Sequence, residues 1–344
     1  MTASPIRLGT RGSPLALRQA ALVADRIRGQ APDRAVEIVP MKTSGDRLAQ
    51  VSLGEFGGKG LYVKELEEAL LAGRVDIAVH SLKDMPAELP EGLCLAAFPP
   101  RDDPRDVLVT RAGGGIADVP DGATVGTSSL RRRVLLLSVR PDLRIEAIRG
   151  NVDTRLAKLS AGTWDAIVVA AAGLARLGLT PANARPLAPE EFVPAVGQGI
   201  LAIEARSADR EVRALLAAVD DPATRAQADA ERAFLRQLGA SCHTPVAAHA
   251  QLVNGELSLD GFVATLDARR VLRGRVTGAP GSAALLGQKL AGELLARGAR
   301  EIPRHHLATG RLRDGPRGRR GRVHHGPHRQ RGVELRPGPI GEGR

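Results

Sequence analysis

The stretch Asp76-Ile77-Ala78-Val79-His80-Ser81-Leu82-Lys83-Asp84-Met85-Pro86 decides how the rest of the chain is interpreted. Its first half is an apolar run typical of a buried strand, and its second half holds Ser81, Lys83 and Asp84. Open α/β sheets bind their ligands at the carboxyl ends of their strands, so this position predicts a binding or catalytic site. The alternative is a strand end that merely exposes charged side chains to solvent.

Two other segments repeat a related pattern, each a short strand followed by Gly-Thr, hydroxyl side chains and the start of a helix. One runs from Ile6 through Gly9-Thr10 to Ser13-Pro14, and the other runs over 124–133 through Gly126-Thr127 to Ser128-Ser129. Ser is a favoured N-cap and Pro a favoured first helical residue. Because Asp165–Val169 also echoes Asp76–Val79, the sequence predicts two related α/β domains.

Further elements follow from apolar spacing and from Gly, Pro and Asn-Gly signals. They are a helix from Pro14 to about Arg28 with Gly29 beyond its end, a helix over 61–72, a strand over 93–98, a strand turning into a helix over 148–156, a return strand over 200–204, a helix from Pro222 to about Leu238, a hairpin over 246–265 with Asn254-Gly255 at its turn, and a helix over 282–297.

The predicted fold class is α/β with a third, small α+β domain. Domain 1 covers 1–99, domain 2 covers 100–198, a segment over 199–219 returns to domain 1, domain 3 covers 220–302, and a tail covers 303–344. The stiff polar run over 99–104 marks the first connection, and the Gly content of 194–199 is typical of a hinge.

The net charge of +11 is concentrated in the tail. Residues 303–344 hold eleven Arg against three acids, so the rest of the chain has a net charge of only +3. The tail is rich in Gly and Pro and has no aromatic residue, so it is predicted to be disordered. It resembles a different reading frame of a GC-rich gene, or a truncated extension, more than a designed basic arm.

Several protein classes are disfavoured by composition. No apolar run approaches the ~18 residues of a membrane span, and no basic-then-apolar signal begins the chain. The two cysteines, Cys94 and Cys242, are far apart, which argues against a disulfide framework or a metal cluster. Gly57-Gly58-Lys59-Gly60 lacks the order of a phosphate-binding P-loop, and the few aromatic residues disfavour nucleic-acid binding. The chain is therefore expected to be cytoplasmic.

An anion site is predicted where Gly126-Thr127-Ser128-Ser129 opens a helix, because backbone N–H groups and hydroxyls converge there. The cations expected around it are Arg131, Arg132, Arg149 and Arg155. Several guanidinium groups in one cleft indicate a polyanionic ligand. Taken alone, Arg131-Arg132-Arg133 is more often a solvated helix face, and the similar pattern at Arg11 and Ser13 weakens that alternative.

Two loops add candidate residues. The polar stretch over 41–60, with Lys59, is long enough to be a functional lid. Cys242 lies in the loop Gly239-Ala240-Ser241-Cys242-His243-Thr244-Pro245, where its thiol is accessible and suited to a covalent role. A Cys-His dyad is a poor explanation, since sequence neighbours seldom face each other for attack. Cys94, in an apolar run, is expected to be inert.

With these segments in view, residues 6–302 resemble the porphobilinogen deaminase family, also called the hydroxymethylbilane synthases. The motifs that carry the resemblance are Leu8-Gly9-Thr10-Arg11-Gly12-Ser13-Pro14-Leu15-Ala16, Lys59-Gly60-Leu61-Tyr62-Val63-Lys64-Glu65-Leu66-Glu67, Val79–Pro86, Gly126–Arg132, Arg149–Leu156, Ala195–Gly199 and the Cys242 loop. Ser241, His243-Thr244 and Tyr62 depart from the usual family residues, and the tail after Ile302 has no counterpart there.

The resemblance implies domains 1 and 2 built like the halves of a type II periplasmic binding protein, with mixed sheets. It implies a transferase of porphyrin and haem biosynthesis that joins four porphobilinogen molecules head to tail, releasing ammonia, to give the linear tetrapyrrole hydroxymethylbilane. It also implies a dipyrromethane cofactor held on Cys242 by a thioether, no metal, and a monomer without nucleic-acid or membrane partners.

The resemblance also implies roles for the candidate residues. Asp84 would be catalytic, assisting loss of ammonia and stabilising a cationic azafulvene-like intermediate. The cofactor would be held by Lys83, Ser13, Ser81, Thr127, Ser128, Ser129, Arg131 and Arg132, and the substrate by Arg11, Arg149, Arg155, Gln198 and Lys59. The alternative from another class is a non-catalytic cytosolic protein that binds an organic polyanion.

Overall fold

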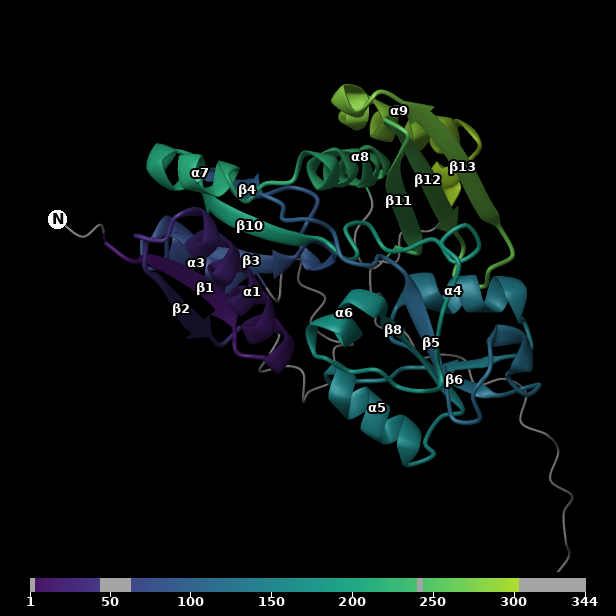
Figure 1. The fold of residues 1–344 in the computed structure, drawn as a ribbon. Coiled ribbons are helices and arrows are strands. Elements are labelled where there is room, and N and C mark those ends of the chain that lie inside the picture. Colours follow the sequence, from purple (N-terminus) through teal and green to yellow (C-terminus); the bar gives the residue numbers. More distant parts are fainter. Residues whose placement is uncertain (1–3, 44–62, 240–243, 303–344) are drawn as a thin grey trace, which may run out of the picture. The chain divides into compact units, whose positions relative to one another are not determined.

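The computed structural model describes residues 4–43, 63–239 and 244–302 (Figure 1). The predictions for Lys59, Cys242 and the tail over 303–344 lie outside the described residues. Within the described part, the strands form two five-stranded sheets and one three-stranded sheet. This arrangement confirms the predicted fold class.

The first sheet has the strand order β2-β1-β3-β10-β4. Its strands are β1 (Ile6–Arg11), β2 (Val36–Met41), β3 (Ile77–Ser81), β4 (Leu93–Ala97) and β10 (Leu201–Arg206). Its helices are α1 (Pro14–Gln30), α3 (Lys64–Leu71) and α7 (Arg210–Ala217), with a 3₁₀ turn, η1 (Leu82–Asp84), after β3. β1, β2 and β3 run parallel, whereas β10 is antiparallel to β3 and β4.

The second sheet, in the order β7-β6-β8-β5-β9, repeats this topology. Its elements are β5 (Asp106–Thr110), η2 (Ile116–Asp118), β6 (Thr124–Gly126), α4 (Leu130–Val139), β7 (Arg144–Glu146), α5 (Val152–Ser160), β8 (Ala166–Ala170), α6 (Ala171–Arg176) and β9 (Ala184–Pro186). β6, β7 and β8 are parallel, and β5 is antiparallel to β8 and β9. The predicted relation between the two α/β domains is therefore present in the fold.

Two chain segments connect the sheets, one before β5 and one before β10. Asp102 N donates to Gly199 O over 3.1 Å, so the segments are bonded to each other. Gly199 has φ +87°, and a Cβ there would lie 2.4 Å from Asp102 O. The close crossing of the two connections therefore requires glycine at this position.

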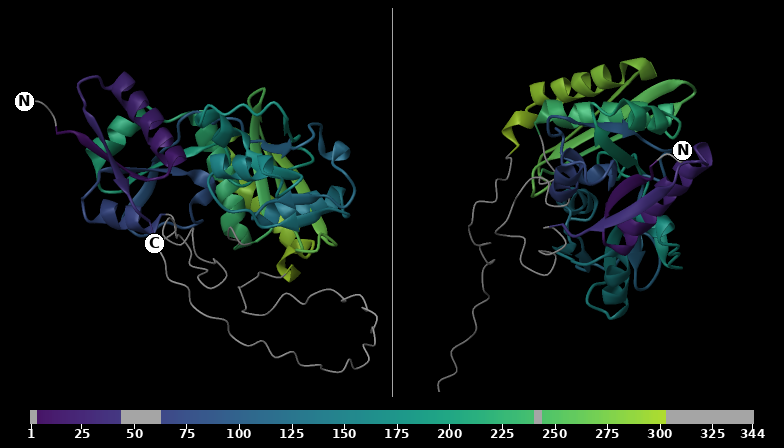
Figure 2. Two further views of the ribbon diagram at one scale, coloured as in Figure 1. Left: turned by 90° about the horizontal axis from the view of Figure 1, so that it is seen from below. Right: turned by 90° about the vertical axis from the view of Figure 1, so that its left-hand side faces the viewer.

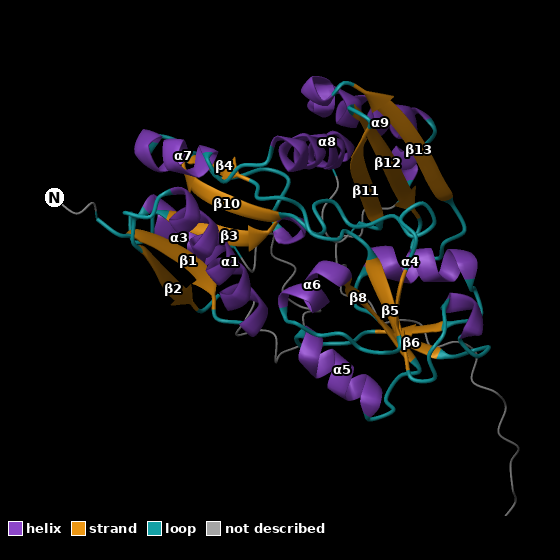
Figure 3. Cartoon of the chain, in the orientation of Figure 1, coloured by secondary structure: helices purple, strands orange, loops and turns teal. Residues whose placement is uncertain are grey.

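The third sheet is the antiparallel meander β11 (Val246–Val253), β12 (Glu256–Ala264) and β13 (Val271–Gly278). Two long helices, α8 (Pro222–Leu238) and α9 (Ala283–Ala296), pack against each other and against this sheet (Figures 2 and 3). The short turns η3 (Pro280–Ser282) and η4 (Ala299–Glu301) flank α9. Phe234, Leu259 and Leu290 belong to the shared core.

Several sequence predictions are confirmed and others are corrected. Asn254 and Gly255 both have positive φ, as the predicted hairpin turn requires. The helix α1 continues through Gly29 to Gln30, so Gly29 does not terminate it. No strand forms at Ile148, because the short β7 already ends at Glu146. β13 was not predicted, because its Arg and Gly residues interrupt the apolar alternation.

Candidate active site

A cavity of about 220 Å³ lies beside the turn that follows β3. Six predicted site residues line it: Lys83, Asp84, Ser129, Arg131, Arg132 and Gln198. The other lining residues are Leu82, Met85, Ala195, Val196, Arg232, Leu235, Thr244 and Val246. The cavity therefore gathers residues from both five-stranded sheets, from α8 and from the segment that follows Cys242.

The carboxyl end of β3 places Lys83 and Asp84 at the cavity. β3 stops at Ser81, and η1 then turns the chain so that Leu82 is buried while the Asp84 side chain is exposed. Ser81 Oγ accepts a hydrogen bond from Gln19 Nε2 of α1 over 2.9 Å. This contact fixes the start of the turn, so Ser81 acts here as an anchor for Lys83 and Asp84.

Lys83 donates from Nζ to Gln198 Oε1 over 3.3 Å. Burial, helped by the nearby Arg132, lowers the pKa of Lys83 to about 8, although Asp84 and Asp106 act in the opposite direction. The Lys83 side chain is therefore still protonated at neutral pH. An added anion in the cavity would stabilise this charged form further. That response suits a group that binds carboxylates.

Arg131 and Arg132 are held by a buried carboxylate that sequence reasoning missed. Asp106, at the start of β5, is 0% exposed and forms ion pairs of 2.7 Å with Arg131 Nη1 and with Arg132 Nη2. Burial raises the pKa of Asp106, but the two guanidinium groups outweigh burial and hold the pKa far below its usual value. Asp106 is therefore ionised and compensates part of the charge of the two arginines.

Gln198 joins this cluster to the connection between the sheets. Its Nε2 donates to Pro104 O over 2.7 Å and to Asp106 Oδ1 over 3.1 Å. Its Oε1 accepts from Lys83, so one amide links a cation on the first sheet to an acid on the second. This geometry fixes which end of the amide faces Lys83.

The remaining hydroxyl candidates make local backbone contacts. Ser13 and Ser129 cap α1 and α4, accepting from Ala16 N and Arg132 N. Ser128 Oγ donates to Ile148 O over 2.7 Å, and Thr127 Oγ1, in a buried side chain, accepts from Ser129 N over 3.2 Å. Ser129 alone of these four lines the described cavity.

The other arginine candidates lie apart from the cavity lining. Arg11 ends β1 and is partly buried, and Arg149 is exposed ahead of α5. Arg155 Nε donates to Gly150 O over 2.8 Å, which stabilises the start of α5. Their proposed part in substrate binding stays a prediction, as does that of Lys59.

Asp106 and Arg232 are the site residues that sequence reasoning missed. Asp106 carries a faint signal, a single acid at the start of the otherwise apolar run Asp106-Val107-Leu108-Val109. Arg232, 5% exposed, shares a helix face with Ala228 and Leu235, where an apolar residue would be expected. A charged residue on an apolar face indicates a specific buried partner.

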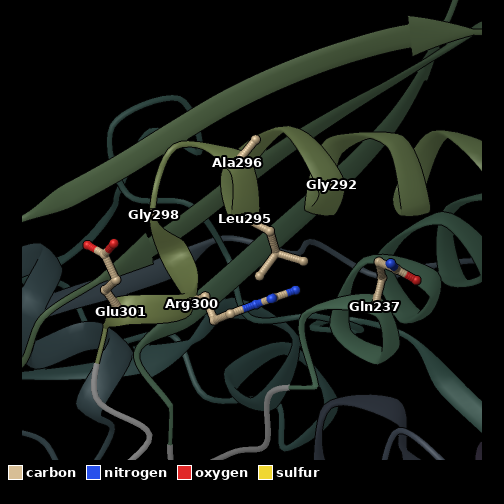
Figure 4. Close-up of a pocket in the computed structure, with 7 residues that line it drawn as sticks. All are labelled: Gln237, Gly292, Leu295, Ala296, Gly298, Arg300 and Glu301. Atoms are coloured by element: carbon tan, nitrogen blue, oxygen red, sulfur yellow. The ribbon is translucent and has the colours of Figure 1, made fainter.

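A second cavity, of about 560 Å³, lies between the ends of α8 and α9 (Figure 4). Its described lining contains Arg300 and Glu301 as charged residues, together with Gln237 and small or apolar positions. An opposite pair of charges does not favour a polyanion. Across the described part of the chain, no cluster of three or more His, Cys, Asp or Glu residues could hold a metal ion.

The fold and the site define a class of protein: a two-lobed α/β protein with an added small domain, whose cavity brings several cations beside one exposed carboxylate. The family model described as "Porphobilinogen deaminase, dipyromethane cofactor binding domain" matches residues 6–214. The model "Porphobilinogen deaminase, C-terminal domain" matches residues 226–296. The chain belongs to the porphobilinogen deaminase family, whose members are transferases that act on porphobilinogen.

Curated relatives agree with this assignment. The chain is 50% identical over 302 residues to porphobilinogen deaminase of Syntrophobacter fumaroxidans, covering 88% of this chain and 98% of the relative. It is 48% identical over 300 residues to that of Syntrophus aciditrophicus, covering 87% and 98%. A solved VFT2 domain of BvgS from Bordetella pertussis aligns at 17% identity and a TM-score of 0.37, covering 62% of this chain and 86% of that chain, and this similarity is too low to carry an argument.

The residues at the cavity fit the dipyrromethane cofactor of this family. Such a group carries acetate and propionate carboxylates, which require cationic partners. Lys83, Arg131 and Arg132 supply three cations against one ionised Asp106 in their shared cluster. The buried Nε of Arg131 has no hydrogen-bond partner among the residues that the structure describes, which leaves a donor for an added carboxylate.

Proposed function

We propose that this chain joins four porphobilinogen units into hydroxymethylbilane, and that Cys242 carries the priming dipyrromethane. The observation that supports this most directly is the makeup of the 220 Å³ cavity. Its wall combines the Asp84 carboxylate and the cations Lys83, Arg131 and Arg132 with Thr244, two residues beyond Cys242. The segment that follows Cys242 in the sequence therefore lines the cavity in which a carboxylate-bearing group would be bound.

Lys83, Arg131, Arg132 and Ser129 would hold the carboxylates of the cofactor. Charge-assisted hydrogen bonds of this kind contribute roughly 1.5–3 kcal/mol each. Because Asp106 fixes both guanidinium groups before any ligand arrives, little side-chain entropy is lost on binding. When bound, the dipyrromethane supplies the nucleophilic pyrrole carbon to which substrate is added.

Asp84 is the proposed catalytic acid and base. In each addition a C–N bond of the substrate breaks, releasing ammonia, a C–C bond forms, and the pyrrole carbon that attacks loses a proton. After the fourth addition, hydrolysis by water would free the linear tetrapyrrole. Positive charge develops on the substrate as ammonia departs, and a carboxylate stabilises that charge. The exposed Asp84 side chain lies at the cavity wall, where it can contact the substrate pyrrole and accept the displaced proton.

Intact-protein mass spectrometry tests the attachment. Wild-type protein exposed to porphobilinogen should carry a pyrrole adduct that is lost in Cys242→Ala and retained in the matched control Cys94→Ala. Cys94 lies in β4, away from the cavity lining. An unmodified, folded wild-type protein after this exposure would contradict the proposal.

The role of Asp84 is tested separately by steady-state turnover of porphobilinogen. Asp84→Ala should retain the adduct at Cys242 while turnover falls by about 10²–10⁴-fold, the usual range for loss of an acid–base group. Rates near those of wild type would exclude the proposed role. A non-catalytic polyanion-binding protein, the alternative from sequence, is not supported, since the chain belongs to an enzyme family.

The expected setting of the enzyme completes the proposal: a cytoplasmic monomer without nucleic-acid or membrane partners. Among the described helices, none combines the length and apolar character that crossing a membrane takes. The monomeric state is tested by light scattering of the purified protein, where a mass of twice 36.2 kDa would contradict it.

A further inference from the structure

Arg232 of α8 contacts the turn that carries Asp84. Its Nη1 donates to Pro86 O and its Nη2 to Ala87 O, both over 3.0 Å. The two carbonyls belong to consecutive residues, so the planar guanidinium group binds the backbone of the turn through two hydrogen bonds. These are the second and third residues after Asp84, close enough to set the direction of its side chain.

The contact between Arg232 and the Asp84 turn is buried. The Arg232 side chain is 5% exposed, and Ala228, one helical turn earlier, packs in one apolar cluster with Leu82 and Met85. Arg232 and Leu235 both line the cavity that contains Asp84. The same face of α8 therefore meets the Asp84 turn through apolar packing at Ala228 and through hydrogen bonds at Arg232.

The turn is also fixed from two other directions. Leu82 N donates to Ile200 O over 3.0 Å, and Ser81 accepts from Gln19. Both contacts precede Asp84, whereas those of Arg232 follow it. Without Arg232, the residues after Asp84 would lose both of these hydrogen bonds to α8 and would keep the apolar packing of Met85.

The charge of Arg232 is retained at neutral pH. Burial, helped by the neighbouring Arg236, lowers its pKa to about 10, whereas Asp229 and Glu204 act in the opposite direction. The guanidinium hydrogen bonds given above go to neutral carbonyls, so its positive charge persists beside the cavity.

We propose that Arg232 is a positioning residue that holds Asp84 in its working orientation, an inference that rests on the proposed function. α8 ends at Leu238, six residues and about 9 Å beyond Arg232 at 1.5 Å per residue. Gly239, with φ +60°, caps the helix, and Cys242 follows three residues later in the sequence. The same helix therefore contacts the Asp84 turn through Arg232 and ends a few residues before the cofactor cysteine in the sequence.

Turnover of Arg232→Gln tests the role. The variant should lose about 10- to 100-fold in kcat with KM changed less than about twofold, because a displacement of about 1 Å impairs chemistry more than binding. Arg232→Lys, which can keep one of the two donors, should recover part of the loss. Arg236→Gln, an exposed arginine one turn along the same helix, is the matched control and should behave like wild type.

A raised KM with unchanged kcat would instead mean that Arg232 binds substrate carboxylates, and it would overturn the proposal. A double-mutant comparison tests more directly whether Arg232 acts through Asp84. If Arg232 acts through Asp84, adding Arg232→Gln to Asp84→Asn should cost little further single-turnover rate, whereas multiplied losses would contradict that route.

Hydrogen exchange supplies a readout without activity. The amides of Met85, Ala87 and Glu88 should exchange faster in Arg232→Gln than in wild type, with residues 246–264 of the third sheet unchanged as evidence of folding. Unchanged exchange at these amides would overturn the proposal. Failure of the proposed function would appear separately, as wild-type protein that forms no adduct at Cys242.

Discussion

The two five-stranded sheets share a topology but differ in the residue that begins the pairing of their antiparallel strand. In the first sheet Leu201 of β10 pairs with Ser81 at the end of β3, and in the second Asp106 of β5 pairs with Ala170 at the end of β8. Both Leu201 and Asp106 are buried. At this position an apolar residue therefore completes the core of the first lobe, whereas the second lobe has a buried carboxylate there.

The difference explains where the cations of the site can be buried. Arg131 and Arg132, on the helix after β6, are 5% and 6% exposed and share Asp106 as their counter-ion. The helix after β1 instead buries the neutral Gln19, which contacts Ser81. Asp106 thus lets the second lobe bury two guanidinium groups at this position, because buried guanidinium groups require a paired charge.

The largest effect is expected from Asp106→Leu, which gives the second lobe the residue of the first. Leaving two buried arginines without their carboxylate should lower the free energy of unfolding by about 3–5 kcal/mol. Urea denaturation measures this change, with Asp142→Leu at the exposed Arg140 pair as a control that should cost much less. A loss below about 1 kcal/mol would mean that Asp106 does not compensate the arginines.

Removing the whole cluster separates stability from binding. In Asp106→Leu/Arg131→Leu/Arg132→Leu, most of the stability lost by Asp106→Leu should return, because apolar residues can replace a buried ion cluster at little cost. Cofactor assembly should nevertheless be abolished, as mass spectrometry would show. Retention of the adduct in the triple variant would contradict the carboxylate-binding role of the arginines.

Lys83 is the cation that the first lobe contributes, and its pH dependence sharpens the comparison. With a pKa of about 8, Lys83 loses its charge as the pH rises through 8, so adduct formation by cofactor-free protein should slow above that pH. Lys83→Arg keeps its charge, and the decline should move to higher pH. An identical pH profile for the two proteins would exclude Lys83 as the titrating cation.

The smallest effects should come from the two N-caps. Ser13→Ala and Ser129→Ala should each cost about 1 kcal/mol in thermal or urea unfolding, because each hydroxyl accepts from a helix N–H. Only Ser129→Ala should also weaken cofactor assembly, since Ser129 lines the cavity. Equal loss of assembly in both variants would remove this distinction between the lobes.

The amino-acid sequence predicted the local features of the fold well. Ser13 and Ser129 do cap helices, and β10 does return to the first sheet. The duplicated scaffold is also visible at two acids: Asp76 accepts from Arg7 N of β1, and Asp165 accepts from Thr124 N of the equivalent strand β6. These features depend on residues close in the chain or on repeated patterns, which one sequence displays directly.

The tertiary structure alone decided which candidates share the cavity and what holds them. Asp106 lies 25 residues from Arg131, and Arg232 lies 146 residues from Pro86, so no local pattern records either contact. The sequence by itself determined the chemistry, an acid and several cations suited to a polyanion. Folding decided their pairing, because the cost of burying a charge or a carbonyl depends on partners that only the packed chain brings within hydrogen-bonding distance.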